Sequence, residues 1–567
     1  MRQPAPDAAA VAPDSSITPL AGDLRVRAAA LIVLAALAIV AGAPGSTRLP
    51  LDPHEAFVVQ GAREMAARHD WMVPWFNGAP RLAKPPMSYW LTGIVARLDG
   101  SLGNVRPVHA RTVSLIAALG LVLLCYLTGR ELFDEFTALL GTLVLVTGRG
   151  FFYYAHDGRP DMLYAFFCSA ALTAFVLAMG KAPGPRRTGT ILVMWAAYAL
   201  AILTKGPQMP LAFMAASLLY YRIGSGGWRG AATMFHPFTG PALMLLLVLP
   251  WWLYVQHHVA GGLSGTQLGG ALLYLRPARI LNLFYLYKIP VLALPWIVLA
   301  PFALWRIFTG EKVKSGFWLP VCLILVPALM FSMGSQQRTV YLLPCLIPLS
   351  LFLASGIGVL HRLQEHRRWP LIAAILIAFL SVAPLVLMSK LLLNNARLQA
   401  GPWLGCLWSA PAAWLLWSRM QMRWRGRVAA ILLWSGICLA LGYALLGITG
   451  SGWSRERYER RHLALAAAHA AAAGQLVSYA VEPDVFVYYA RRTIPEIRRP
   501  ARLHAALGRN RDANLVAIVN KGSLPDLRRR FQVRILAAYR EHFANSLAAV
   551  RLGPLHGNLP SGSAAGQ

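Results

Sequence analysis

Long apolar runs separated by short polar connections fill most of this 567-residue chain, up to about residue 450. A helix needs roughly 20 mostly apolar residues to cross the hydrocarbon core of a bilayer, and the spacing predicts about thirteen such spans. We expect them near residues 27–43, 110–128, 136–154, 162–180, 190–204, 207–222, 238–255, 283–306, 317–333, 341–360, 369–389, 402–418 and 428–449. The runs lack the alternation of a β-barrel, and backbone polar groups in lipid must be satisfied within the chain, so the spans should be helices.

Lysine and arginine residues are concentrated in alternate loops between these runs. The positive-inside rule places such loops in the cytoplasm. The loops of this parity contain Arg130; Lys181, Arg186 and Arg187; Arg222 and Arg229; Arg306, Lys312 and Lys314; Arg362, Arg367 and Arg368; and Arg419, Arg423, Arg425 and Arg427. We therefore expect residues 1–26 to be a disordered cytoplasmic N-terminus, and the long loop 44–109 and the tail 451–567 to lie outside.

Composition agrees with a membrane protein. The chain is 57% hydrophobic and 14% charged, with a mean hydropathy of +0.50, which is more apolar surface than a soluble core could bury. Its formal net charge of +31 does not indicate nucleic-acid binding, because the basic residues are spread over loops and tail instead of lining one groove. Attraction to anionic lipid headgroups explains this charge better.

The first outer loop has more pattern than a simple connection requires. Ala56, Val59, Ala62, Met65 and Ala66 recur at helical spacing, which predicts an amphipathic helix along the membrane surface that covers a cavity.

Three charged residues of this loop have both a structural and a functional interpretation. Asp52 suits the N-cap of the predicted helix and Glu55 suits its third position, so the two can form a capping box; they can equally serve as acid–base groups. Lys84 precedes two prolines in extended backbone, where it is either a solvated lysine or a functional cation.

The later outer loops also carry charge close to the predicted lipid boundary. Asp161 directly precedes the apolar run 162–167, so it either caps that helix or faces a polar cavity, and we favour the cavity. An Asp157–Arg159 ion pair is the structural alternative for this loop. Lys205 fits the C-terminus of a helix, where the helix dipole favours a cation.

The tail after residue 450 changes character. Residues 454–473 predict a helix, 475–479 and 514–519 predict strands, and 524–531 predict a second helix. We expect residues 451–567 to form a small α/β domain.

An ordered series of short motifs gives the chain a family resemblance. It comprises Glu55-Ala56, Ala62-Arg63-Glu64-Met65, Asp70-Trp71, Pro74, Asn77-Gly78, Lys84-Pro85-Pro86, Tyr89-Trp90-Leu91, Ala110-Arg111, Asp161-Met162, Lys205-Gly206-Pro207, Pro250-Trp251, Pro295-Trp296, Phe331-Ser332 and Tyr341-Leu342-Leu343-Pro344. On these motifs the region 27–350 resembles bacterial membrane glycosyltransferases related to protein O-mannosyltransferases, especially the aminoarabinose transferase of lipid A.

The resemblance implies an all-α polytopic membrane protein of the C-type glycosyltransferase fold, with a transmembrane domain over 27–450. It implies a polyprenyl-phosphate sugar as donor and an envelope acceptor, preferably lipid A or another lipid. It also implies a multi-pass protein of the bacterial inner membrane whose active site faces the periplasm. The reaction would be hexosyl or pentosyl transfer, in which the acceptor attacks the anomeric carbon as polyprenyl phosphate leaves.

The resemblance also suggests roles for individual residues. The catalytic candidates are Asp52, His54, Glu55 and Asp161, and the candidates for binding the donor phosphate are Lys84, Arg338 and Tyr341. A carboxylate or imidazole near the acceptor could remove its proton, while cations stabilise the departing phosphate. The proton acceptor is open among Asp52, His54 and Glu55, because His54 stands where the family has the first acid of a pair.

Departures from the family pattern limit what can be carried over. Phe57 replaces the arginine usual after the acidic pair, and Ala83 replaces the acid that often precedes Lys84, which lowers the expectation of the family's occasional divalent metal. We expect no required cofactor and assign no metal-site residues, and the sequence supports a divalent metal only weakly. The alternative function is a transporter or flippase of a lipid-linked sugar, although such proteins place charges at mid-membrane depth and not at one surface.

Overall fold

The computed structural model of the protein describes residues 49–225, 227–262, 284–308, 315–334, 337–363, 455–472, 474–509, 515–538 and 546–554. The predicted N-terminus 1–26 and the spans predicted at 27–43, 369–389, 402–418 and 428–449 lie outside the described residues.

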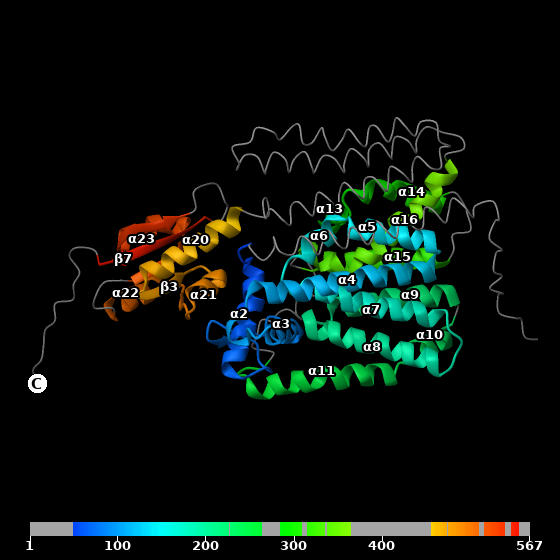
Figure 1. Ribbon diagram of the computed structural model, residues 1–567, viewed down its shortest axis with the longest axis horizontal. Helices are drawn as coiled ribbons and strands as arrows, with labels where there is room; N and C mark the ends of the chain where they lie inside the picture. Colours follow the sequence, from blue (N-terminus) through cyan, green and yellow to red (C-terminus); the bar gives the residue numbers. More distant parts are fainter. Residues whose placement is uncertain are drawn as a thin grey trace, which may run out of the picture.

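Long helices packed side by side form the main body (Figure 1). The first part of this bundle contains α4 (Pro107–Leu132), α5 (Glu135–Val146), α6 (Arg149–Ala155), α7 (Pro160–Met179), α8 (Pro185–Lys205), α9 (Gln208–Ser225), α10 (Trp228–Phe235) and α11 (Thr239–His258). The second part contains α13 (Phe284–Leu292), η3 (Trp296–Leu299), α14 (Ala300–Phe308), η4 (Ser315–Phe317), α15 (Trp318–Ser332), η5 (Thr339–Cys345) and α16 (Leu346–Leu363).

Within the described ranges, five helices are long and apolar enough to cross a membrane, or six if the pair α5 and α6, bent by 58°, is one span. The five are Pro107–Leu132, Pro160–Met179, Pro185–Lys205, Trp228–His258 and Thr339–Gly356. The span expected over 283–306 is instead divided among α13, η3 and α14, where Pro290, Pro295 and Pro301 supply no backbone N–H for continuous helical hydrogen bonding. A total of thirteen spans stays a prediction.

Close packing between α8 and α11 shows how the bundle is held. Gly240 lies so near Trp195 that a Cβ at position 240 would come within 2.0 Å of the indole Nε1, which itself donates to the Phe235 carbonyl at 2.8 Å. On another face of α11, Leu245 and Leu246 are 52% and 69% exposed. Such large exposed apolar side chains suit contact with lipid.

The first outer loop folds across one end of the bundle. It consists of α2 (Pro53–Arg68), β1 (Trp75–Phe76), β2 (Ala79–Pro80), α3 (Met87–Leu98) and η1 (Leu102–Asn104), and α2 runs across the direction of the bundle helices (Figure 1). The helix predicted from the apolar spacing is present, and its Ala56, Val59, Ala62 and Met65 are fully buried. That it lies along the membrane surface stays a prediction.

The described part of the C-terminal region combines helices with one sheet. Its elements are α20 (Arg455–Ala470), β3 (Gln475–Tyr479), α21 (Asp484–Ala490), β4 (Glu496–Ile497), α22 (Pro500–Arg509), β5 (Leu515–Asn520), η6 (Lys521–Ser523), α23 (Leu524–Arg530), β6 (Gln532–Ala538) and β7 (Leu547–Gly553). The strand order is β4-β3-β5-β7-β6, with β3 parallel to β4 and β5, and β7 antiparallel to β5 and β6. A separate periplasmic domain with the boundaries 451–567 stays a prediction.

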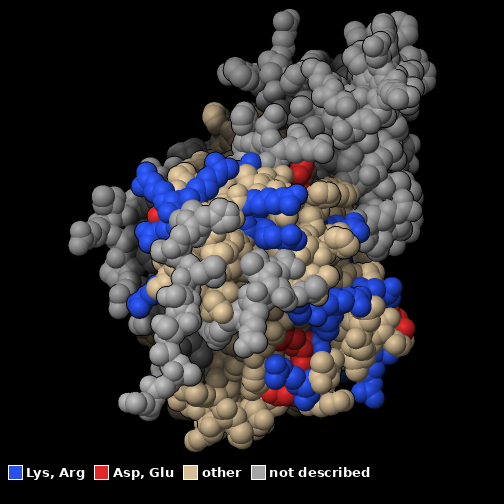
Figure 2. All heavy atoms as spheres, turned by 90° about the vertical axis from the view of Figure 1, so that its left-hand side faces the viewer, with Lys and Arg blue, Asp and Glu red and all other residues tan. Residues whose placement is uncertain are grey.

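The C-terminal region packs against the first outer loop. The Asn77 side chain donates to the Ile494 carbonyl at 2.8 Å and accepts from the Ile494 N–H at 2.7 Å, and the Tyr489 hydroxyl accepts from the Leu51 N–H at 3.0 Å. The end of the molecule formed by this region carries many more lysine and arginine than acidic side chains (Figure 2). The outer loop therefore lies between the helical bundle and a basic C-terminal region.

Candidate functional site

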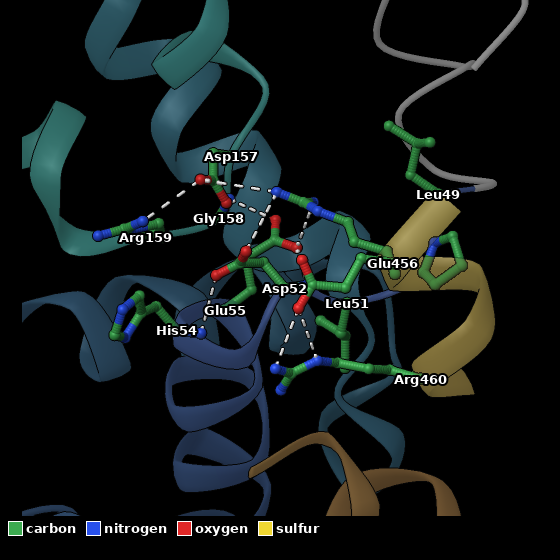
Figure 3. Close-up of polar contacts among 12 residues, drawn as sticks. Leu49, Leu51, Asp52, His54, Glu55, Asp157, Gly158, Arg159, Glu456 and Arg460 are labelled. Carbon is green, nitrogen blue, oxygen red and sulfur yellow. Dashed lines mark hydrogen bonds and ion pairs between the residues drawn. The ribbon is translucent and has the colours of Figure 1, made fainter. Parts of the chain in front are cut away.

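Charged side chains from distant parts of the sequence meet where α2 crosses the ends of the bundle helices (Figure 3). Two groups can be distinguished. We call Lys84, Arg159, Asp161, Lys205 and Arg338 the cation cluster, and Asp52, Glu55 and Asp157 with Arg111 and Arg457 the acid cluster.

Asp161 is the acid at the centre of the cation cluster. It lies in the first turn of α7 and is 3% exposed. One carboxylate oxygen accepts a hydrogen bond from Arg159 Nε at 2.9 Å, and the other accepts one from Lys205 Nζ. Lys205 ends α8, and because α7 and α8 form an antiparallel pair, the last residue of one helix reaches the first turn of the other. Lys205 is therefore an ion-pair partner and not only a helix C-terminal cation.

Lys84 has no ion-pair partner among the described residues. It lies in the bend before α3, and among the described residues its ammonium makes no hydrogen bond or ion pair. Burial, with help from the nearby positive charge of Lys205, lowers the pKa of Lys84 to about 8, and Asp161 acts in the opposite direction. A desolvated ammonium that lies among other cations is strongly stabilised by a bound anion.

Arg338 and His54 connect the cation cluster to the start of α2. The His54 Nε2 lies 3.3 Å from Arg338 Nη1, and since a guanidinium only donates, Nε2 must accept. Burial and the charges of Arg159 and Arg338 lower the pKa of His54 to about 4, so its imidazole is neutral near pH 7. Tyr341 lies beside this cluster, with its ring centroid 5.1 Å from Lys205 Nζ.

Glu55 has a fully occupied carboxylate. Arg111 Nε and Nη2 donate to its two oxygens at 2.8 and 2.7 Å, the Gly158 N–H donates at 2.6 Å, and Arg457 Nη1 donates at 3.2 Å. The side chain is fully buried, and the arginines hold the pKa of its carboxyl well below the usual range despite burial. This geometry favours a structural role for Glu55 over proton transfer, because no oxygen is left for an acceptor.

Asp52 is the more accessible acid of the acid cluster, with its side chain 21% exposed. It caps α2 by accepting from the His54 N–H at 2.9 Å, while its own N–H donates to Glu55 at 3.0 Å. The capping box expected from the sequence is therefore present. Capping uses one oxygen, and the other lies 3.6 Å from Arg457 Nη2.

Asp157 was missed as a site residue from the sequence. It is 3% exposed, and neither carboxylate oxygen has a hydrogen-bond partner in the described part of the chain. Arg457 and Arg159 approach one of these oxygens at 3.9 and 4.0 Å. Burial and the charge of Glu55 raise the pKa of Asp157 well above its usual range. The ion pair with Arg159 anticipated from the sequence is thus long and weak, because Arg159 is directed to Asp161.

Two arginines complete the acid cluster. Arg111 was visible only as part of a motif at the start of a span, and Arg457 lies in the tail, more than 400 residues from Glu55. A buried carboxylate demands a partner, but the sequence alone does not tell which cation the fold will bring to it. Across the described residues, no group of three or more His, Cys, Asp or Glu side chains is arranged to hold a metal ion.

Comparison with known proteins gives this site a context. Residues 83–254 match the family model described as dolichyl-phosphate-mannose-protein mannosyltransferase. The chain is 28% identical over 331 residues to an undecaprenyl phosphate-alpha-4-amino-4-deoxy-L-arabinose arabinosyl transferase of Sodalis glossinidius, covering 55% of this chain and 56% of the relative. A transferase of the same name from Edwardsiella ictaluri is 25% identical over 341 residues, 57% of this chain and 58% of its own length. The match thus spans a little over half of these relatives.

Solved structures extend the likeness to nearly the whole chain. The crystal structure of ArnT from Cupriavidus metallidurans bound to undecaprenyl phosphate superposes with a TM-score of 0.68 at 18% identity, over 92% of this chain and 97% of that one. The apo state of the same protein gives the same TM-score at 17% identity. The chain therefore has the mostly helical fold of the ArnT structures, and it is similar to the bacterial membrane glycosyltransferases of the protein O-mannosyltransferase and lipid A aminoarabinose transferase type.

Proposed function

We propose that this protein transfers a sugar from a polyprenyl-phosphate carrier to an envelope acceptor, with lipid A or another lipid preferred. The observation that carries the proposal is the excess of positive charge in the cation cluster: Arg159 and Lys205 pair with Asp161, and Arg159 also lies 4.0 Å from Asp157. Lys84 and Arg338 have no ion-pair partner among the described residues. Such an excess suits a phosphate. Relatives and one structural neighbour are named for undecaprenyl phosphate, which fits this ligand.

The donor phosphate would lie against Lys84, Arg338 and Tyr341. When the acceptor oxygen bonds to the anomeric carbon, the bond from that carbon to the phosphate oxygen breaks, and its electron pair leaves on polyprenyl phosphate. Lys84 and Arg338 stabilise the negative charge that develops there. Asp161 keeps Arg159 and Lys205 in place, so these cations remain oriented before the donor arrives.

The acceptor's proton would go to one of two groups at the start of α2. His54 is neutral near pH 7, and Asp52, whose side chain is 21% exposed, lies two residues before it. A hydroxyl acceptor needs such a base, whereas a phosphate monoester of lipid A is already ionised and needs none. Comparing hydroxyl and phosphate acceptors therefore tests whether His54 and Asp52 act in proton transfer.

We place the site on the periplasmic face of the bacterial inner membrane. The loops expected in the cytoplasm contain Lys181, beyond the far end of α7 from Asp161, and the site lies at the near end with the first outer loop. The orientation can be measured in cells. In a cysteine-free background, Leu98→Cys should react with a membrane-impermeant maleimide in intact spheroplasts and Lys181→Cys only after lysis. The reverse pattern would overturn the orientation.

The activity is tested with purified protein in nanodiscs. Undecaprenyl-phosphate aminoarabinose and lipid A are supplied, and free undecaprenyl phosphate and modified lipid A are measured by mass spectrometry. We expect both products from the wild type. A transporter or flippase would move the donor between leaflets of a vesicle without releasing undecaprenyl phosphate, so donor movement without release would overturn the proposal.

A further inference from the structure

The C-terminal helix α20 contributes a side chain to the acid cluster. Arg457 lies in its first turn and is 6% exposed. Its Nη1 donates to Glu55 at 3.2 Å, and its Nη2 lies 3.6 Å from Asp52 and 3.9 Å from Asp157. Asp52 and Glu55 belong to the first outer loop, and Asp157 belongs to the loop between α6 and α7. One guanidinium thus lies among acids from two loops (Figure 3 shows the acids).

Contacts made by α20 and by α21 fix the position of Arg457. On the same helix, Arg460 donates to Glu456 at 3.2 Å and to Asp484 of α21 at 2.9 Å. Tyr489 of α21 holds the Leu51 N–H, directly before Asp52. The guanidinium and the acids it faces are therefore held within one packed unit and not brought together by a flexible surface contact.

The charges of the acid cluster make Arg457 hard to replace. Glu55 has Arg111 as its own bidentate partner, and Asp157 has Arg159 only at 4.0 Å. The charged and titratable groups near Arg457 include Asp52, Glu55, Asp157, Tyr153 and the like charge of Arg111. Without Arg457, Asp52 and the buried Asp157 would lose the cation that lies near both, which favours displacement of the more exposed Asp52.

We propose that Arg457 is a positioning residue of the transfer site, so that helix α20 is part of the catalytic unit. It holds the oxygen of Asp52 that does not cap α2, and it lies 3.9 Å from the buried Asp157. Asp52 in turn accepts from the His54 N–H, so both candidate proton acceptors depend on this arginine. The inference rests on the proposed function, because the role is defined by the sugar transfer.

The test compares Arg457→Gln and Arg457→Lys with the wild type in the nanodisc assay, using an acceptor that carries a hydroxyl. Arg461→Gln is the matched control, because it removes an exposed arginine of the same helix that lies outside the acid cluster. We expect Arg457→Gln to lower kcat about 10- to 100-fold, with the donor KM within about twofold, because misplaced catalytic groups affect the chemical step while Lys84 and Arg338 still bind the donor. The kcat of Arg457→Lys should lie between those of Arg457→Gln and the wild type, and Arg461→Gln should keep the wild-type kcat.

A second substitution separates positioning from a merely structural role. Adding Asp157→Asn to Arg457→Gln removes the buried acid that lies 3.9 Å from Arg457 and should restore part of kcat, whereas a merely structural defect of α20 would not be relieved by this change.

Three results would decide the matter. A wild-type kcat in Arg457→Gln would overturn the role of Arg457, as would an equal loss of kcat in Arg461→Gln with no recovery of Arg457→Gln by Asp157→Asn. If the wild type itself releases no undecaprenyl phosphate, the proposed function fails, and the inference fails with it for that separate reason.

Discussion

Lys205 and Asp161 join the end of α8 to the start of α7 through a direct ion pair, 44 residues apart in sequence. Both side chains are nearly excluded from solvent, at 10% and 4% exposed. A buried pair of this kind is held by mutual attraction, and removing one partner leaves the other charge uncompensated. Asp161 is also bonded to Arg159, so its loss would leave all the cations of the cation cluster to repel one another.

Asp161→Asn should therefore damage transfer more than binding of the acceptor. We expect kcat/KM for the donor to fall by about 100-fold or more, because the preorganised cations lose their common anchor. Steady-state release of undecaprenyl phosphate measures this. Asp134→Asn makes the same change at the N-terminus of α5, at the far end of α4, and should keep nearly full activity; equal losses in both variants would count against a role for Asp161 in the site.

Lys84→Ala should weaken binding of the donor phosphate. Loss of one charged hydrogen bond to phosphate is worth about 1.5–3 kcal/mol, so we expect a kcat/KM lower by about 10- to 200-fold. Lys84→Arg keeps the charge and should retain more activity than Lys84→Ala. Lys181→Ala removes a lysine beyond the other end of α7 and serves as the control. Full transfer by Lys84→Ala at normal expression would refute the donor role of Lys84.

The low pKa of Lys84 predicts a pH dependence of donor capture. The group is charged below about pH 8 and neutral above it in the free protein. Because only the ammonium form attracts phosphate, kcat/KM for the donor should fall as the pH rises through about 8. Bound phosphate favours the charged form of Lys84. The basic limb of the kcat profile, where kcat falls with rising pH, should therefore lie at higher pH than that of kcat/KM. The profile of Lys84→Arg should lack this limb, and an unchanged limb in that variant would assign it to another group.

Local sequence signals predicted the outer-loop helix and the cap formed by Asp52 and Glu55, because both depend on residues within one or two turns. The spacing of apolar residues also located most of the described bundle helices. It did not reveal the division of the region 283–306, since a proline lowers helix continuity without fixing where a break occurs.

The partners of the site acids depend on tertiary structure. Glu55 was a catalytic candidate because of the family resemblance, yet the fold surrounds it with Arg111, Arg457 and the Gly158 N–H. Arg457 follows a stretch of apolar sequence and has no motif around it. A contact between residues so far apart in the sequence cannot be predicted from local patterns. For the same reason Asp157 was not among the candidate site residues.

The burial of Glu55 between two arginines makes the stability of the protein sensitive to this residue. Glu55→Gln cannot neutralise Arg111 and Arg457, and breaking a buried ion pair from one side typically costs about 3–5 kcal/mol. We expect a markedly lower midpoint of thermal unfolding in detergent, or loss of folded protein. Glu131→Gln breaks the partly exposed contact with Arg130 and should change stability by less than about 1 kcal/mol. Similar midpoints for the two variants would contradict the structural role of Glu55.

The packing of α8 against α11 gives a prediction that is independent of the chemistry. Gly240→Ala would place a Cβ within 2.0 Å of the Trp195 indole, which is fixed by its hydrogen bond to Phe235, so the helices must separate or the indole must move. Overpacking of this kind costs about 1–3 kcal/mol. Gly189→Ala, in α8, adds a methyl group that would meet no neighbouring atom within 4 Å, and it should be neutral or stabilise by about 0.5–1 kcal/mol. Thermal unfolding of the two variants in the same detergent measures the difference, and a Gly240→Ala protein as stable as Gly189→Ala would show that α8 and α11 do not pack as closely as described.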